Sequence, residues 1–171
     1  RRHTLSYSVT GVQTCAPPIY PMESNVPPPT FSAAEAAAAC QPGSLPVAAQ
    51  RGLALFNQGR YFDAHEELEL AWQAEHGLVR ELYRGILQIA VAYYHLLRGN
   101  YIGTIKMFTR AQRWLAPYPD RCYGIDVARL RQDARQVEAE VLQLGPNRIA
   151  EFDARHLPPL HYDSPNQLTL D

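Results

Sequence analysis

The sequence predicts an all-α fold, a compact antiparallel bundle of about five helices arranged as two hairpins and a C-terminal capping helix. Apolar residues recur at three- and four-residue steps throughout residues 46–145, which is the period of a buried helix face. Prolines gather instead in residues 1–46 and 146–171. The chain also partly matches itself after a shift of forty residues. We therefore expect one helical domain over 46–145, followed by a Pro-containing C-terminal tail that either folds back on it or stays disordered.

Composition sets the class of protein. The chain has 171 residues, 46% of them hydrophobic and 19% charged, which suits one ordinary folded domain. Sixteen basic against 17 acidic residues give a net charge of -1, so the basic footprint of a nucleic-acid or membrane-surface protein is missing. No apolar run approaches the roughly 18 residues of a membrane span. We expect a protein, peptide or small ligand as partner, in an oligomeric state that the sequence does not indicate.

The three cysteines are Cys15, Cys40 and Cys122. Their odd number and the lack of zinc-type spacing predict neither a disulfide framework nor a thiolate metal site. The prediction is a protein of the reducing cytoplasm.

The N-terminal residues need separate treatment. Residues 9–19 resemble the translation of a sequencing adapter, so we expect residues 1–21 to be a non-native extension of an environmental sequence, with Met22 as the natural start. Residues 22–45 form a Pro- and Ala-rich flank. Within it, Ser32 and Glu35 have the spacing of a capping box and predict a short peripheral helix over 31–40.

Each of the main helices is bounded by a proline, a glycine or a capping residue. The expected ranges are residues 46–58, 61–76, 78–98, 101–116 and 126–144. Gly59, Gly77 and Gly99 mark three of the helix ends, and Asp126 is the expected N-cap of the last helix.

The internal repeat pairs Gly59 with Gly99 and Tyr61 with Tyr101. Each unit is a helix, a glycine-containing turn, an aromatic residue and a second helix, which resembles a tetratricopeptide repeat. With two units, the helix over 126–144 would act as the cap. The alternative is that two hairpins independently use glycine in the turn and tyrosine after it.

The candidate functional residues lie on the two central helices. In the helix over 61–76, His65 and Glu69 share an edge beside Trp72, with Glu66 slightly further round. A histidine and a carboxylate one turn apart can hold one metal ion, and a second carboxylate can serve as a general base. The order is close to the His-Glu-x-x-His helix of zinc proteases, with a glutamate in place of the second histidine.

The helix over 78–98 is apolar in nearly every direction, and three polar residues form one stripe on it: Arg84, Gln88 and His95. Buried polar groups need partners, because each unsatisfied one costs about 1–3 kcal/mol. We expect Arg84 to pair with Glu66 or Glu69 on the neighbouring helix, which leaves Gln88 and His95 near His65.

Two functional hypotheses remain open. The first is a non-enzymatic binding or scaffold module whose polar cluster sets the helix register or grips a small ligand or a peptide end. The second is a metal-dependent hydrolase with His65, Glu69 and His95 as ligands, Glu66 as the base and Arg84 as an anion clamp. No cofactor is predicted under the first, and the divalent metal belongs to the second.

Three stretches then resemble a bacterial and archaeal family known as domain of unknown function 309. They are the run from Phe56 to Trp72, the run from Tyr83 to Ala92, and the Gly-Asn turn that follows His95. The resemblance covers about residues 48–130 and implies a small cytoplasmic all-helical protein without an established activity. It also implies that a set of signature positions is carried here by Asn57, Tyr61, His65, Glu66, Glu69, Trp72, Gln88, His95, Gly99 and Asn100. Residues 104–106 depart from the pattern expected after Gly103.

Overall fold

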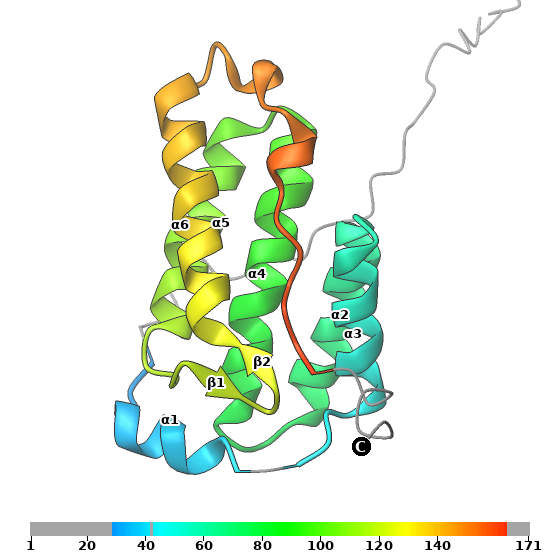
Figure 1. Cartoon of the computed structure of the whole chain (residues 1–171), viewed down its shortest axis with the longest axis vertical. Helices are drawn as coiled ribbons and strands as arrows, with labels where there is room; N and C mark the ends of the chain where they lie inside the picture. The colour runs from blue at the N-terminus through cyan, green and yellow to red at the C-terminus, as the bar shows by residue number, and fades with distance from the viewer. Residues whose placement is uncertain (1–28, 42, 164–171) are drawn as a thin grey trace, which may run out of the picture.

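The computed structural model describes residues 29–41 and 43–163, so the adapter-like stretch and Met22 lie outside the described part of the chain. Within that part the chain forms six α-helices, two short strands and two 3-10 turns (Figure 1). In order, these are α1 (Ala33–Ala39), α2 (Val47–Asn57), α3 (Tyr61–Ala74), α4 (Val79–Leu97), α5 (Tyr101–Leu115), β1 (Arg121–Cys122), β2 (Ile125–Asp126), α6 (Val127–Leu144), η1 (Ile149–Glu151) and η2 (Ala154–His156). The all-α prediction is confirmed. None of these helices is long and apolar enough to cross a lipid bilayer.

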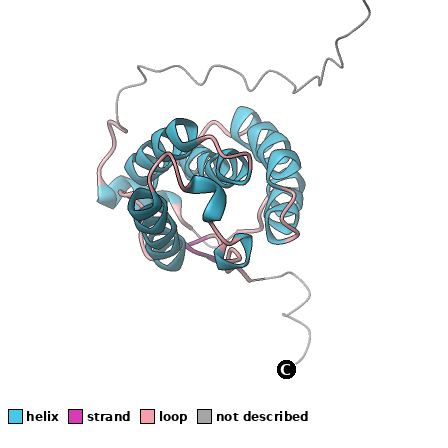
Figure 2. Ribbon diagram, turned by 90° about the horizontal axis from the view of Figure 1, so that it is seen from above, coloured by secondary structure: helices cyan, strands magenta, loops and turns pink. Residues whose placement is uncertain are grey.

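Helices α2 to α5 form two successive antiparallel hairpins, and α4 lies at the centre of the bundle (Figure 1). Viewed along the long axis of the molecule, the long helices lie side by side with their axes roughly aligned (Figure 2). The turns of the two hairpins contain Gly59 and Gly99, whose φ angles of 74° and 71° lie in the left-handed region that favours glycine. The helix after each turn starts at Tyr61 or Tyr101, as the forty-residue self-match predicts.

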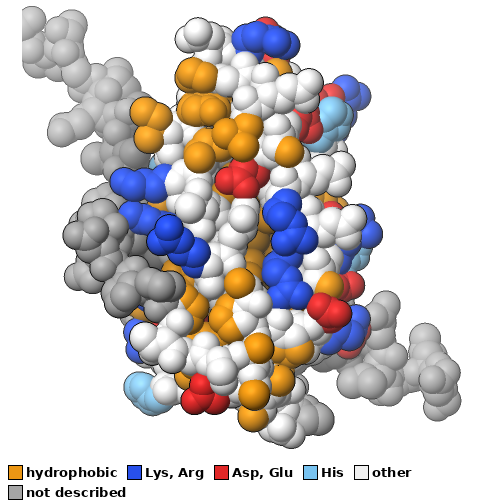
Figure 3. Space-filling view, turned by 90° about the vertical axis from the view of Figure 1, so that its left-hand side faces the viewer, with side chains coloured by type: hydrophobic (Ala, Val, Ile, Leu, Met, Phe, Trp, Pro, Cys, Tyr) orange, Lys and Arg blue, Asp and Glu red, His pale blue; other side chains and the backbone are white. Residues whose placement is uncertain are grey.

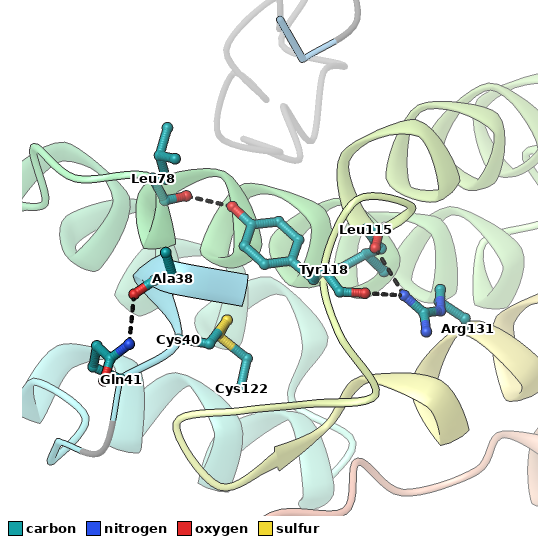
Figure 4. Close-up of a disulfide and its surroundings, with 8 residues drawn as sticks. All are labelled: Ala38, Cys40, Gln41, Leu78, Leu115, Tyr118, Cys122 and Arg131. Carbon is teal, nitrogen blue, oxygen red and sulfur yellow. Dashed lines mark hydrogen bonds between the residues drawn. A yellow bond between two sulfur atoms is a disulfide. The ribbon is translucent and has the colours of Figure 1, made fainter. Parts of the chain in front are cut away.

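Helix α1 begins with the predicted capping box. The Ser32 hydroxyl oxygen accepts a hydrogen bond from the Glu35 backbone N–H at 3.2 Å, and the Glu35 carboxylate accepts one from the Ser32 N–H at 2.7 Å. The chain just after α1 is joined to β1 by a disulfide between Cys40 and Cys122 (Figure 4). The prediction that the cysteines form no disulfide is therefore wrong. The two residues are 82 positions apart, and no local spacing signals a pair that tertiary folding brings together.

The connection between α5 and α6 is held by polar contacts to the backbone. The Tyr118 hydroxyl donates to the Leu78 carbonyl just before α4, and one Arg131 nitrogen donates to the carbonyls of Leu115 and Tyr118 (Figure 4). The Asp126 carboxylate accepts from the Arg129 backbone N–H, which confirms the predicted N-cap of α6.

The tail folds back on the bundle at least as far as residue 163. Helix α6 ends at Gly145, which has a φ of 71°, and the chain then runs down beside α4 and α6 toward α2 (Figure 1). There the Asn57 side chain brackets the backbone of Leu160: its Nδ2 donates to the Leu160 carbonyl at 2.9 Å, and its Oδ1 accepts from the Leu160 N–H at 2.7 Å. Leu160 is buried in the core.

Candidate functional site

Helix α3 carries two of the predicted residues, His65 and Glu69, one turn apart on one stripe. His65 is buried, with its side chain 7% exposed, and its Nε2 lies 3.8 Å from the Glu69 carboxylate one turn later. Its ring also packs against Phe62, with the ring centroids 5.7 Å apart. Burial lowers the pKa of His65, and the negative charges of Glu69 and then Glu66 oppose that shift in part. His65 is therefore held toward its neutral form, in which one ring nitrogen donates and the other accepts.

Helix α4 places Arg84 differently from the prediction. Its Nη1 lies 3.4 Å from the Glu81 carboxylate on the same helix, and its guanidinium carbon lies 4.2 Å from the ring centroid of Trp114. The expected ion pair with Glu66 or Glu69 is wrong. Glu81 is one turn away on the same helix face, so it reaches the guanidinium without spanning two helices.

Two contacts define the register between α3 and α4. The ring centroids of Phe62 and Tyr94 lie 5.4 Å apart, and the Arg84 guanidinium carbon lies 5.4 Å from the Trp72 ring centroid. The helices run antiparallel, so residues between Phe62 and Trp72 on α3 lie opposite residues between Tyr94 and Arg84 on α4. His65 and Glu69 therefore lie opposite the part of α4 that carries Gln88. Of the predicted stripe, this register brings Gln88 to the level of His65 and Glu69, whereas His95 follows Tyr94 at the hairpin-turn end of α4 and contacts Asn100.

The side chains in this contact are not all satisfied. Among the described residues, five buried side-chain atoms lack a hydrogen-bond partner, and every one of them lies on α3 or α4. They are His65 Nδ1, Trp72 Nε1, Arg80 Nε, Arg84 Nε and Gln88 Oε1. Gln88 is only 1% exposed, so solvent does not replace the missing partner of its carbonyl oxygen. We call these five residues the polar face.

His95 lies outside the polar face, near the C-terminal end of α4. Its Nδ1 lies 3.2 Å from the side-chain amide nitrogen of Asn100. Asn100 in turn caps α5, because its side-chain oxygen accepts from the Gly103 backbone N–H at 2.9 Å. Burial, and then the positive charge of Arg98, lower the pKa of His95. This histidine is thus part of the second hairpin turn.

Asn57 and Tyr61 also lie away from the polar face. Tyr61 is buried in an aromatic group, with its ring centroid 5.3 Å from that of Phe56 and 5.2 Å from that of Tyr93. Asn57 is the last residue of α2, at the first hairpin turn, and its side-chain amide forms two hydrogen bonds with the backbone of Leu160. Most of the ten signature positions therefore lie at the α3–α4 contact or at the two hairpin turns, whereas Glu66 is exposed on α3.

The geometry gives no support to the hydrolase hypothesis. The described residues contain no group of three or more histidine, cysteine, aspartate or glutamate side chains placed to hold one metal ion. Of the three candidate ligands, His65 and Glu69 are neighbours while His95 contacts Asn100. Glu66, the candidate base, is exposed.

Three residues of the site were not predicted: Arg80, Glu81 and Trp114. The guanidinium carbon of Arg80 lies 4.6 Å from the Trp72 ring centroid, so it extends the polar face by one turn. The four-residue step from Arg80 to Arg84 was a signal for one shared helix face. Trp114 comes from α5, and no pattern in the sequence links it to α4.

The comparisons agree with this division of the chain. A search of curated proteins finds no match. The segment 49–107 spans α2, α3, α4 and the first turns of α5, and it contains the polar face together with both hairpin turns. This segment matches the model of the family described as Domain of unknown function (DUF309), which confirms the resemblance seen in the sequence.

Proposed function

We propose that this chain is a non-enzymatic binding module and that the polar face between α3 and α4 is its ligand site. The observation that carries the proposal is the concentration of buried, unpartnered side-chain atoms on that face. A small ligand or a peptide end that supplies the missing hydrogen bonds would bind there.

The main alternative is a polar network that only sets the helix register. Such a network is stable when its members satisfy one another, since a partly satisfied network in a low-dielectric interior costs free energy. Here the Gln88 oxygen and His65 Nδ1 have no partner, and each such atom costs about 1–3 kcal/mol. A bound ligand would recover that cost, which supports a binding role over a purely structural one.

A ligand screen with a matched variant tests the proposal. The parent chain and Gln88→Met are heated with the twenty amino acids, short carboxylic acids, nucleotides and divalent metal ions. Binding to the folded state raises the free energy of unfolding by about 2.7 kcal/mol at a hundredfold excess of ligand over Kd, and the melting temperature rises with it. We expect at least one compound to stabilise the parent and to have less effect on the variant, without being consumed.

Two results would contradict the proposal. If no compound distinguishes the parent from Gln88→Met, the polar face is not a ligand site. If a stabilising compound is converted to a product, detected by mass spectrometry of the reaction mixture, the protein is an enzyme.

The partner class remains part of the proposal: a protein, a peptide or a small ligand, rather than nucleic acid or membrane. Figure 3 shows Lys and Arg side chains gathered at mid-height on the side where α5 and α6 lie. Two arginines of α6 are engaged within the chain, Arg129 with Asp133 and Arg131 with Asp120. These ion pairs reduce the positive charge that such helices offer to a polyanion, which supports the choice.

A cytoplasmic location is likewise a proposal, and the Cys40–Cys122 disulfide counts against it, since stable disulfides are rare in reducing compartments. The state of these cysteines is tested by alkylating free thiols in fresh lysates of cells that produce the protein naturally, followed by mass spectrometry. Alkylated Cys40 would support the cytoplasm, and a retained disulfide would point to an oxidising compartment.

A further inference from the structure

Four side chains at one end of the polar face stack cations against aromatic rings. The guanidinium carbon of Arg80 lies 4.6 Å from the ring centroid of Trp72. That of Arg84 lies 5.4 Å from the centroid of Trp72 and 4.2 Å from that of Trp114. Three helices therefore contribute to one cluster: α3 with Trp72, α4 with both arginines, and α5 with Trp114.

The charges of this cluster do not balance. Among the described residues, Glu81 is the acidic residue that forms ion pairs with it, with 3.8 Å from its Oε1 to Arg80 Nε and 3.4 Å from its Oε2 to Arg84 Nη1. One carboxylate thus faces two guanidinium groups. The Arg84 side chain is only 12% exposed, so solvent screens its charge weakly.

The buried atoms of the cluster that make no hydrogen bond are all donors, although Arg80 Nε lies within ion-pair distance of Glu81. They are the Nε–H groups of Arg80 and Arg84 and the Nε1–H of Trp72, and neither guanidinium nor indole nitrogen can accept a hydrogen bond. A complementary ligand group must therefore accept several hydrogen bonds and carry negative charge, which describes an oxyanion.

We propose that Trp72, Arg80 and Arg84, backed by Trp114, bind a carboxylate group of the ligand. This inference rests on the proposed function and names the chemical class of ligand for the same site. The Arg84 guanidinium lies over indole rings, so its in-plane edges remain for polar contacts, and Glu81 takes one of them at Nη1. A planar carboxylate matches such an edge with parallel hydrogen bonds.

Arg80 provides the route into the site. Its side chain is 40% exposed, whereas that of Arg84 is nearly buried. A rotation of Arg80 into solvent would uncover the face of the Trp72 ring on which it now lies. On binding, Arg80 would close over the carboxylate and add its own charge.

The fluorescence of the protein itself reports on this site, because Trp72 and Trp114 are the two tryptophans of the chain. The full chain is titrated with sodium succinate and, separately, with inorganic phosphate, at constant ionic strength set by sodium chloride. We expect a saturable fluorescence change with succinate and a weaker response to phosphate.

Two variants and a matched control complete the test. Arg84→Lys keeps the charge but loses the planar fork, so we expect succinate to bind at least tenfold more weakly. Arg80→Gln, at a more exposed position, should also weaken binding and decides the matter if Arg84→Lys does not fold. The control is Arg60→Gln, which removes an exposed arginine paired with Asp63, and it should bind succinate as the parent does.

The inference fails if succinate acts no differently from chloride, if the arginine variants titrate like the parent, or if phosphate binds more tightly than succinate. The last result would assign the site to phosphate groups. Screening hits that depend on Gln88, lack a carboxylate and are unaffected by Arg84→Lys would also overturn it while leaving the proposed function intact. Succinate binding that depends on Arg84, with no dependence on Gln88 anywhere in the screen, would support the carboxylate site at Arg84 and overturn the role proposed for Gln88 in ligand binding.

Discussion

Replacing Gln88 by methionine should stabilise the protein, although it removes a polar side chain from a helix contact. The two side chains are unbranched and similar in length, and they have similar helix propensities. The Gln88 side-chain oxygen is buried and unpartnered, and the residue is 1% exposed. Removing such an acceptor recovers its desolvation cost of about 1–3 kcal/mol, less the imperfect packing of the new thioether. We expect a net gain of about 1–2 kcal/mol, or roughly 3–6 °C in melting temperature.

The matched control is Thr104→Val, at another buried polar side chain whose hydrogen bond is made. The Thr104 hydroxyl donates to the Asn100 carbonyl at 2.7 Å. Valine keeps the shape and loses this bond, so the free energy of unfolding should fall by about 0.5–1.5 kcal/mol. Both variants are compared with the parent by urea denaturation and by thermal melting, followed by circular dichroism at 222 nm.

The reasoning is refuted if Gln88→Met lowers the free energy of unfolding by 1 kcal/mol or more while Thr104→Val behaves as expected. Gln88 would then have a partner in solution, and the polar face would be a structural network. If Gln88→Met instead gains stability and loses the response to ligand, Gln88 contributes to ligand binding and not to the stability of the fold.

Three further perturbations test other parts of the structure. Asn57→Ala removes both hydrogen bonds to Leu160, so amide exchange over 157–163 should accelerate and stability should fall by about 1–3 kcal/mol; unchanged exchange would mean the tail is held otherwise. Cys40→Ala removes the disulfide that closes a loop across 82 positions, so the free energy of unfolding should fall by at most about 4.5 kcal/mol from loop entropy. Adding a reductant to this variant should then lower its melting temperature no further. Burial lowers the pKa of His65, so the unfolded chain binds a proton first as the pH falls, and unfolding experiments should show stability decreasing from about pH 7.5 to 5.5. His65→Leu should flatten that decrease, and an unaltered slope would exclude His65 as its source.

Local patterns in the sequence were sufficient to predict the helices. The capping box of Ser32 and Glu35, the left-handed turn at Gly59 and the N-cap at Asp126 each depend on residues within about four positions, and the structure contains all three. The apolar run of α4 likewise predicted its central position, because a helix that is hydrophobic all round must be covered on all sides.

Contacts between distant segments could not be predicted in the same way. The Cys40–Cys122 disulfide joins residues 82 positions apart, and the hydrogen bonds between Asn57 and Leu160 join residues 103 positions apart. Neither contact is signalled by a local pattern in the sequence. The stripe on α4 pointed to Arg84 and Gln88, whose side chains both have a buried atom without a hydrogen bond, but it also included His95, which contacts Asn100 in the second hairpin turn. It did not say which partners they would choose, because the choice of Glu81 over Glu69 depends on side-chain reach in three dimensions.

The position of the unpartnered atoms is a stronger argument for function than their number. The other two buried polar side chains in the described part of the chain are paired: the Thr104 hydroxyl donates to a helix carbonyl, and the carboxylate of Asp133 lies 2.9 Å from Arg129. The same sequence thus satisfies polar groups wherever folding alone decides their surroundings. If poor packing left atoms unpaired, they would be scattered over the bundle, yet those in the described part all lie on α3 and α4. A ligand that binds along this contact would supply partners to these atoms, so destabilisation of the unliganded fold and affinity for a ligand would have the same origin.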